Sequence, residues 1–213
     1  MAVLVQAADM AARQGLSTLT IGELATRTRL SKSGLFAHFQ SKEALQLAVL
    51  AYARDKFTDE VIRPATRVRR GEPRVRALFE HWLEISQHTN AECLFVSASA
   101  EFDDRPGPVR DQLVRDHRDC ADSIIQVFRT GITEGDFRAD ADAEQFAYDL
   151  HSIMLGFFHA HRLLGDPRAA QRARRSFEAL LAAARAPRAE PSAPSAQPEP
   201  APQPVPASPI PTA

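Results

Sequence analysis

The chain has few cysteines, no excess of either charge and no long apolar run. Its 213 residues include two cysteines, Cys93 and Cys120, which form no CxxC pair and no Cys/His cluster with zinc spacing. We therefore expect reduced thiols packed as small apolar side chains in a cytoplasmic protein, with a redox switch as the alternative. Without a run of about 18 apolar residues we expect no membrane span. The segment after Met1 also lacks the charged start and cleavage site of a signal peptide.

The balance of charge excludes a protein that is basic overall. The formal net charge is −1, from 26 basic and 27 acidic residues. A surface that binds nucleic acid would have to be local, with acidic residues elsewhere compensating for it. Residues 1–47 carry five basic and three acidic side chains, a net charge of +2. The N-terminal segment is therefore the place to look for such a surface.

The alternation of apolar and polar residues that is typical of strands is nearly absent. Apolar residues instead recur every three or four positions up to residue 186, which predicts an all-α fold. Capping residues, glycines and prolines mark the expected helix ends. The predicted helices run from about Leu4 to Gly15, Thr20 to Thr28, Ser31 to Phe39, Ser41 to Ile62, Pro73 beyond Trp82, Cys93 to Ala100, Pro108 to Gly135, Asp142 to Leu164 and Asp166 to Arg185.

Proline is concentrated at the C-terminus. Ten of the chain's 15 prolines lie between residues 187 and 213, a stretch with no aromatic residue. Such a composition buries too little apolar surface to offset the entropy of ordering, so we expect a disordered proline-rich tail. The prediction is an N-terminal domain over 1–47, a helical domain over 48–186 and a disordered Pro/Ala-rich tail over 187–213.

The segment from residue 20 to residue 39 has the pattern of two short helices joined by a tight turn. Thr20 and Glu23 form a capping box that begins the first helix. Residues 28–30 break its apolar pattern, and Ser31 can cap the second helix by accepting backbone N–H bonds. A first helix that braces a second, which enters the major groove, is a helix-turn-helix.

The second of these helices has one apolar face. Leu35 and Phe39 lie four residues apart and point inward, which leaves the residues between and before them facing outward. Gly34 costs about 1 kcal/mol relative to alanine inside a helix, which suggests a close approach to DNA. The alternative is that Gly34 packs against the first helix. The outward residues are Lys32, Ser33 and Ala37.

The flanking residues suit phosphates. Phe36 can lie along the sugar–phosphate backbone but has no hydroxyl to donate, whereas His38 can donate from its ring. Lys42 falls in the first turn of a helix capped by Ser41, where backbone N–H groups and the helix dipole also favour an anion.

These runs resemble the DNA-binding domain of the TetR family, the tetracycline-repressor-like regulators. The similarity covers about residues 3–50 and includes TIGELA at 20–25, LSKSGLFAHF at 30–39 and SKEAL at 41–45. The resemblance implies a transcriptional regulator that binds double-stranded DNA, a repressor that releases a palindromic operator when a small hydrophobic effector binds. It implies a homodimer with no enzymatic activity, cofactor or metal.

The resemblance also implies roles for single residues. Lys32 and Ser33 would face bases with Ala37 nearby, and Thr20, Phe36, His38 and Lys42 would hold phosphates. The full predicted DNA-binding set is Thr20, Arg29, Ser31, Lys32, Ser33, Gly34, Phe36, Ala37, His38 and Lys42.

Three positions depart from the family's pattern. Family members usually have tyrosine at position 36, so Phe36 loses one phosphate contact. Arg29 stands where the turn usually has glycine, so Arg29 is strained if φ is positive there, or it adds a phosphate contact. The family's first helix has a few more residues, often basic, before the position of Val3, so either the start lies upstream or an arm that reaches the minor groove is absent.

The region from residue 142 to residue 164 is apolar on nearly every side, which indicates burial on every side. In a chain of this size we expect one face to meet a second subunit, forming a four-helix interface with the last helix. A two-fold dimer would place its recognition helices about 34–36 Å apart. The alternative is a central helix of a monomer.

A small-molecule pocket is the family's second feature. Mostly apolar and aromatic candidates favour a hydrophobic effector, which His88, His117 and His151 could orient, and plain core packing is the alternative for each residue. The candidates are Trp82, Ile85, His88, Phe95, Phe102, His117, Val127, Phe128, His151, Met154 and Phe158.

Two other function classes are weaker. Titratable residues recur at His151, His159 and His161 and at Glu101, Asp103 and Asp104. His159 and His161 point to different helix faces, and no HExxH, GxSxG or Walker motif occurs, so we do not expect an enzyme. An interaction protein that docks through its tail is also disfavoured, because the tail has no clear PxxP with flanking basic residues.

Overall fold

The structure is a computed structural model that describes residues 2–88 and 93–187, without the side chains of His88 and Cys93. The described residues form helices and an isolated bridge between Phe137 and Arg185, so the predicted all-α class is confirmed. The predicted disorder of the tail concerns residues that, apart from Pro187, lie outside the described part. The helices are α1 Ala2–Gln14, α2 Ile21–Thr28, α3 Lys32–Phe39, α4 Lys42–Phe57, α5 Arg63–Arg67, α6 Glu72–His88, α7 Cys93–Phe102, α8 Pro108–Thr133, α9 Ala143–Phe158 and α10 Ala169–Ala184, with π-helical turns at Thr58–Ile62 and His159–Leu163.

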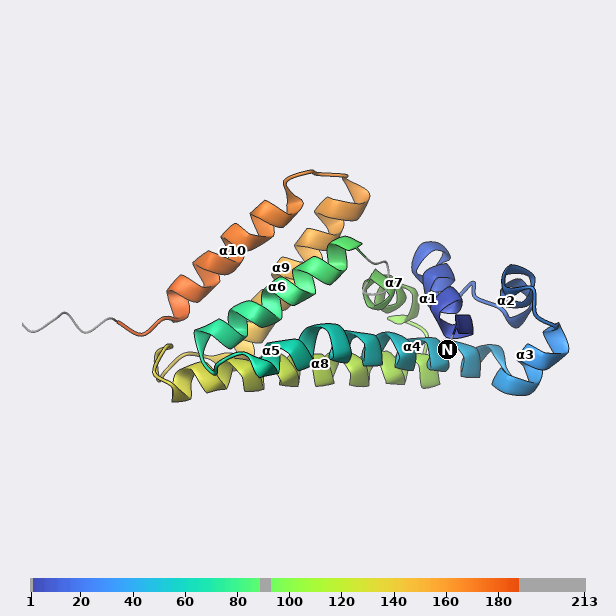
Figure 1. Cartoon of the computed structure of the whole chain (residues 1–213), viewed down its shortest axis with the longest axis horizontal. Helices are drawn as coiled ribbons and strands as arrows, with labels where there is room; N and C mark the ends of the chain where they lie inside the picture. Colours follow the sequence, from blue (N-terminus) through green and yellow to red (C-terminus); the bar gives the residue numbers. More distant parts are fainter. Residues whose placement is uncertain (1, 89–92, 188–213) are drawn as a thin grey trace, which may run out of the picture.

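The long axis of the molecule is formed by α4, α5 and α8. Figure 1 shows α4 running alongside α8 and continuing into α5, with α1, α2 and α3 at one end and α6, α9 and α10 at the other. Helix α7 lies between these two groups and packs against α1 and α8. The candidate recognition helix α3 therefore lies at the extreme end of the molecule.

The helix that follows α3 does not end at Ile62 before Pro64, as the sequence predicted. It continues through a π-helical turn, in which the N–H of Arg63 bonds to the carbonyl of Thr58, and then through α5 to Arg67. A π turn widens the helix, and Pro64, which has no N–H to donate to the preceding turn, directly follows this irregular stretch. The proline therefore marks an irregular turn within a longer helical segment.

The beginning of the last helix also differs from the prediction. Asp166 accepts a hydrogen bond from the backbone N–H of Arg168 at 2.9 Å, which makes a separate turn. Helix α10 begins only at Ala169. By contrast, Asp142 caps α9 by accepting from the N–H of Gln145 at 2.9 Å, as predicted.

Two apolar cores are present among the described residues. The N-terminal core, formed by α1 to α4, is completed by Leu94, Ala98 and Phe102 of α7 and by the first turns of α8. The larger core lies among α6, α8, α9 and α10. Within it Phe128 stacks on Phe146, with ring centroids 4.1 Å apart. Because α7 belongs to the N-terminal core and also packs against α8, it joins the N-terminal helices to the body of the molecule.

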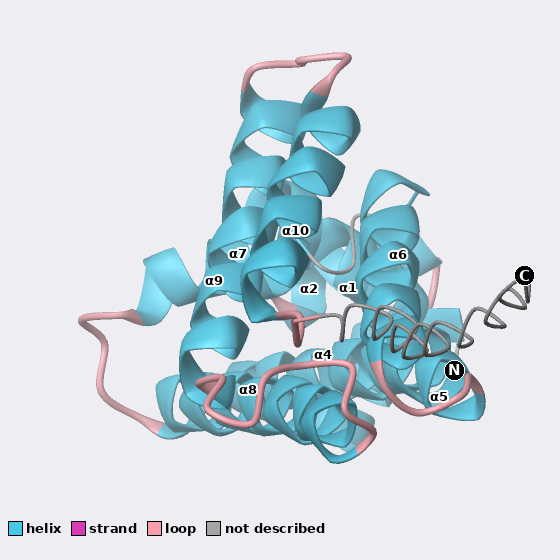
Figure 2. Ribbon diagram, turned by 90° about the vertical axis from the view of Figure 1, so that its left-hand side faces the viewer, coloured by secondary structure: helices cyan, strands magenta, loops and turns pink. Residues whose placement is uncertain are grey.

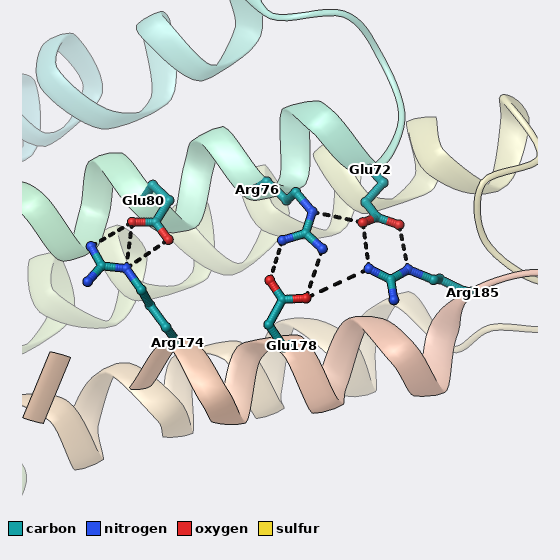
Figure 3. A network of polar contacts seen from close by, with 6 residues as sticks. All are labelled: Glu72, Arg76, Glu80, Arg174, Glu178 and Arg185. Carbon is teal, nitrogen blue, oxygen red and sulfur yellow. Dashed lines mark hydrogen bonds and ion pairs between the residues drawn. The ribbon is translucent and has the colours of Figure 1, made fainter. Parts of the chain in front are cut away.

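A network of ion pairs joins the outer faces of α6 and α10 (Figure 3). Glu72 accepts from Arg76 and from Arg185, each at 2.8 Å, and Arg76 also pairs with Glu178. The hydrogen bonds from these two arginines, of which that from Arg185 has the larger effect, lower the pKa of Glu72 to about 2. This network holds the C-terminal half of α10 against α6.

Candidate functional site

The first helix of the predicted helix-turn-helix begins at the capping box. The hydroxyl of Thr20 accepts from the N–H of Glu23 at 3.2 Å and donates to its carboxylate at 3.0 Å. Ile21, Leu24 and Ala25 are buried and hold α2 against the N-terminal core. Thr20 is half-buried, so its hydroxyl lies at the surface but is already used within the cap.

The turn between α2 and α3 depends on Arg29 adopting a left-handed conformation. Its φ is 56° and its ψ is 27°, and its N–H bonds to the carbonyl of Ala25. This is the strained outcome considered from the sequence. A residue with a Cβ pays about 1–2 kcal/mol in this region, a cost that glycine avoids. The side chain of Arg29 is exposed.

A second strained residue, which the sequence did not reveal, follows α3. Gln40 has φ 64° and ψ −39°, and the N–H of Ser41 bonds to the carbonyl of Phe39 at 2.7 Å. This three-residue bond is that of a γ-turn with positive φ, which is rare. Glutamine carries no signal for positive φ, so only the packed structure reveals it. Strained residues therefore lie at the end of α2 and at the end of α3.

Helix α3 presents the faces that the sequence predicted. Ser31 caps it by accepting from the N–H of Gly34 at 3.1 Å, and Leu35 and Phe39 are buried. A Cβ at Gly34 would meet the hydroxyl oxygen of Ser31 at 2.9 Å and nothing else within 4 Å. Packing of Gly34 against α2 is therefore not seen, and its small size instead leaves room for the cap. The exposed residues of α3 are Lys32, Ser33, Gly34, Phe36, Ala37 and His38.

The predicted phosphate-binding residues surround this face. Phe36 is 56% exposed, a large apolar ring held at the surface. The ring of His38 lies edge-on to Phe39, with centroids 4.6 Å apart. Lys42 is exposed and donates to the carbonyl of Ser17, which uses one of its three N–H donors and leaves two for a phosphate.

A cavity of about 70 Å³ lies among α4, α6, α7, α8 and α9. The structure brings together six of the eleven residues that the sequence proposed as pocket lining: Trp82, Phe95, His117, His151, Met154 and Phe158. The lining residues that the sequence reasoning missed are Arg54, Phe57, Val96, Asp116, Cys120 and Leu155.

Other predicted lining residues lie elsewhere. Ile85, Val127 and Phe128 are buried in the larger core and do not line the cavity. Phe102 belongs to the N-terminal core and borders a separate surface hollow. The side chain of His88 lies outside the described residues. Apolar spacing placed all of these side chains inward but could not separate packed ones from those facing a cavity.

The polar lining of the cavity includes two neutral imidazoles. Nε2 of His117 lies 2.7 Å from the hydroxyl oxygen of Ser99, and the rings of His117 and His151 meet edge-to-face at 5.7 Å. Burial lowers the pKa of both histidines. Because an unperturbed histidine is already mostly neutral at pH 7, both rings are neutral at that pH.

Asp116 is the charged lining residue that is most deeply buried. Its side chain is 2% exposed, and burial raises its pKa, although Gln112 and Arg54 counteract this effect. Gln112 donates to Oδ1 at 2.8 Å, and Nη1 of Arg54 lies 3.6 Å from the same oxygen. Asp116 lies three residues after Leu113, on the apolar stripe of α8, and this spacing was the sign in the sequence that its side chain points inward.

The clusters that might have indicated other functions do not assemble in the described residues. No group of three or more metal-ligating side chains is found in residues 2–88 and 93–187. No described helix has the length and apolar character needed to cross a membrane. Glu101 does not join Asp103 and Asp104 but accepts hydrogen bonds from the turn between α1 and α2.

A helix-turn-helix that presents its second helix at the end of a helical body defines the class of transcription regulators that bind DNA. Residues 3–49 match the family model described as bacterial regulatory proteins, tetR family, and residues 71–177 match the one described as tetracyclin repressor-like, C-terminal domain. The chain belongs to the TetR family of transcriptional regulators.

Solved structures of other TetR-family proteins share the fold. A TetR-family regulator from Agrobacterium tumefaciens is 18% identical, with a TM-score of 0.75 over 86% of this chain and 96% of that one. A TetR regulator from Chloroflexus aurantiacus is 23% identical, with a TM-score of 0.73 over 85% and 91%. AibR, solved with isovaleryl coenzyme A and operator DNA, is 20% identical, with a TM-score of 0.66 over 84% and 94%. No protein of curated function matches the sequence.

Proposed function

We propose that this regulator is a homodimeric repressor that binds a palindromic operator through α3 and releases it when a small hydrophobic effector occupies the cavity. In this proposal residues 1–47 bind DNA, residues 48–186 bind the effector and form the dimer, and no catalysis or cofactor takes part. The observation that carries it is the orientation of α3. Leu35 and Phe39 are buried while Lys32 and Ser33 are exposed at the end of the molecule.

The proposed contacts divide into two kinds. Lys32 and Ser33, with Ala37 beside them, would meet base edges, because they lie on the outer face near the N-terminus of α3. Phosphates would be held by exposed or half-exposed groups around that face, and Ser31 and Gly34 would allow a close approach of the backbone. The phosphate set is Thr20, Arg29, Phe36, His38 and Lys42.

The proposed dimer interface is the outer face of α9 and α10, which stand side by side in Figure 2. Helix α9 is not a fully covered central helix, since Tyr148 is 69% and Leu155 41% exposed. Small side chains line a groove between the two helices, including Gly156 and Ala160 of the α9 segment and Ser176 of α10. Such residues allow a second pair of helices to approach closely and complete a four-helix interface.

The effector step rests on a population shift. A ligand that favours one dimer geometry would change the spacing of the two α3 helices and therefore the affinity for DNA. AibR, which shares the fold, was solved with both isovaleryl coenzyme A and operator DNA, so an effector is a ligand that this fold can bind. In our proposal the effector of this chain occupies the cavity, which is lined mainly by apolar and aromatic side chains.

The proposal is tested by selecting bound duplexes from a random pool and measuring the affinity of the wild type and of Ser33→Glu by fluorescence anisotropy. We expect selection of an inverted repeat and loss of binding in the variant, because a carboxylate at the groove repels phosphates. A panel of hydrophobic compounds should then release the wild type from the selected duplex. Failure to bind any duplex at low salt would contradict the proposal.

A matched control separates this effect from damage to the fold. Ser123→Glu places the same charge in the middle of α8, far along the chain from the DNA-binding helices. This control should keep wild-type affinity for the selected duplex. Light scattering of both variants should give the mass of a dimer, and a monomeric mass for the wild type would contradict the proposed assembly.

A further inference from the structure

Asp116, which lines the cavity, has one side-chain oxygen without a hydrogen-bond partner in the described part of the chain. Oδ2 of Asp116 is buried and has no hydrogen-bond partner among the described residues. The other oxygen, Oδ1, accepts a hydrogen bond from Gln112 at 2.8 Å, whereas Arg54, at 3.6 Å, is within ion-pair range but too far for a hydrogen bond. A buried acceptor without a partner costs free energy, and native proteins leave few of them.

The charges around the cavity show which ligands the carboxylate can accept. The guanidinium of Arg54 is also held by Asp55, through its Nε at 3.3 Å and its Nη2 at 3.1 Å. The two imidazoles of His117 and His151 are neutral at pH 7, because burial lowers the pKa of both. Arg54 is shared between the carboxylates of Asp116 and Asp55, so the lining has no unpaired cation for an anionic ligand. A ligand that carries a hydrogen-bond donor can instead bind the free oxygen of Asp116.

The remaining lining determines the rest of the ligand. Phe57, Trp82, Phe95, Met154 and Phe158 supply apolar surface around the carboxylate. Since a single water needs about 10–15 Å³ of such space, the 70 Å³ available suits a group of about one six-membered ring. The cavity is too small for a coenzyme in this conformation, because sites for larger ligands span about 300–1,000 Å³.

We propose that Asp116 is the polar anchor of the effector cavity and that its ligand is a small apolar ring or chain carrying a hydrogen-bond donor, a hydroxyl or a protonated amine, which donates to Oδ2. This inference rests on the proposed function, in which the cavity is the effector site. It goes further by naming the ligand's polar group and by excluding carboxylates and other acids.

Trp82 gives a direct readout of occupancy. It is the single tryptophan of the chain, it is 5% exposed, and it lines the cavity. Its fluorescence can be followed in the full chain without DNA, so a failure here is distinguishable from a failure of operator binding. The probes are cyclohexanol, cyclohexylamine, cyclohexanone and cyclohexanecarboxylate, which share one ring and absorb little where tryptophan is excited.

We expect cyclohexanol or cyclohexylamine to bind at least about tenfold more tightly than cyclohexanone, which cannot donate, and cyclohexanecarboxylate not to bind. The order of the alcohol and the amine then shows whether the donor is neutral or charged. Equal binding of alcohol and ketone, preference for the acid, or no response to any probe would each overturn the proposal.

Two substitutions of the anchor test its role. Asp116→Leu removes both oxygens at similar volume and should abolish the preference for donors over the ketone. Asp116→Asn keeps an acceptor without the charge, so it should weaken the binding of cyclohexylamine about tenfold and leave the binding of cyclohexanol unchanged. This variant provides the test if Asp116→Leu does not fold. Asp122→Asn, exposed on the same helix and outside the cavity, is the control and should bind the probes like the wild type. Unchanged selectivity in the anchor variants would contradict the assignment.

Discussion

The carboxylate of Glu101, at the end of α7, accepts a hydrogen bond from the backbone N–H of Ser17 at 2.7 Å. Its other oxygen accepts from the N–H of Leu16 at 3.1 Å, and a Cβ at Gly15 would come within 2.9 Å of that oxygen. On the opposite side, Gln46 of α4 donates to the carbonyl of Leu16 at 2.8 Å. The turn between α1 and α2 is thus held by α7 and α4 together.

Removing this carboxylate should loosen the turn. We expect Glu101→Ala to lower the free energy of unfolding by about 1.5–3 kcal/mol, because two hydrogen bonds to a charged group are lost. Amide hydrogen exchange should accelerate at Leu16 and Ser17 more than in α9. Asp103→Ala, an exposed residue of the same region, is the control. Unchanged exchange at Leu16 and Ser17 would show that Glu101 does not hold the turn.

Lys42 should act on affinity without acting on sequence preference. We expect Lys42→Ala to weaken DNA binding by a similar factor for all duplexes and to reduce the slope of log K against log salt by about one, since one phosphate contact is lost. Lys32→Ala should instead change the preferred sequence. Lys56→Ala, in the last turn of α4 near Glu60, is a control of equal charge. The division of roles is wrong if Lys42→Ala and Lys32→Ala alter sequence preference equally.

Glycine substitutions at Arg29 and at the nearby Arg27 should change the stability of the fold in opposite directions. Arg29→Gly should raise the free energy of unfolding by about 1 kcal/mol, because glycine accepts φ 56° without strain. Arg27→Gly, inside α2, should lower it by about 1 kcal/mol, because glycine is a poor helix former. Chemical denaturation measures both. A loss of stability in Arg29→Gly comparable to that in Arg27→Gly would contradict the left-handed turn.

The ion-pair network should make stability sensitive to acid. The pKa of Glu72 is about 2 in the folded chain, below its ordinary value of 4.5, so its contribution is complete above about pH 4.5. That contribution is lost as the pH falls from about 4.5 toward 2. Glu72→Gln should therefore lower stability at neutral pH and flatten the decline below pH 4.5. The measurement is the free energy of unfolding against pH, and an equally steep acid decline in the variant would contradict the pairing.

The local features of the DNA-binding end were largely predictable from the sequence. Caps at Thr20, Ser31 and Ser41 depend on residues three positions away, so their signals are contained in short stretches. The burial of Leu35 and Phe39 follows from their spacing along one helix. These features required no knowledge of how distant segments meet.

Features that depend on tertiary packing were not predictable. The helix continues past Pro64 because Val61 and Ala65, on either side of it, are fully buried in the larger core. Arg54 and Asp116 come together from different helices, so no spacing in the sequence links them. Phe128 was placed in the pocket because apolar periodicity marks it as inward-facing, although its ring packs against other phenylalanines.

Two copies of α3 should enter successive major grooves of one duplex, and footprinting of the wild type on its selected operator measures this. We expect two protected half-sites in inverted orientation, with centres about 10 base pairs, or 34–36 Å, apart or a multiple of one helical turn. Their protection should be lost together in Ser33→Glu. A single protected site without symmetry, or one that survives in Ser33→Glu, would contradict it.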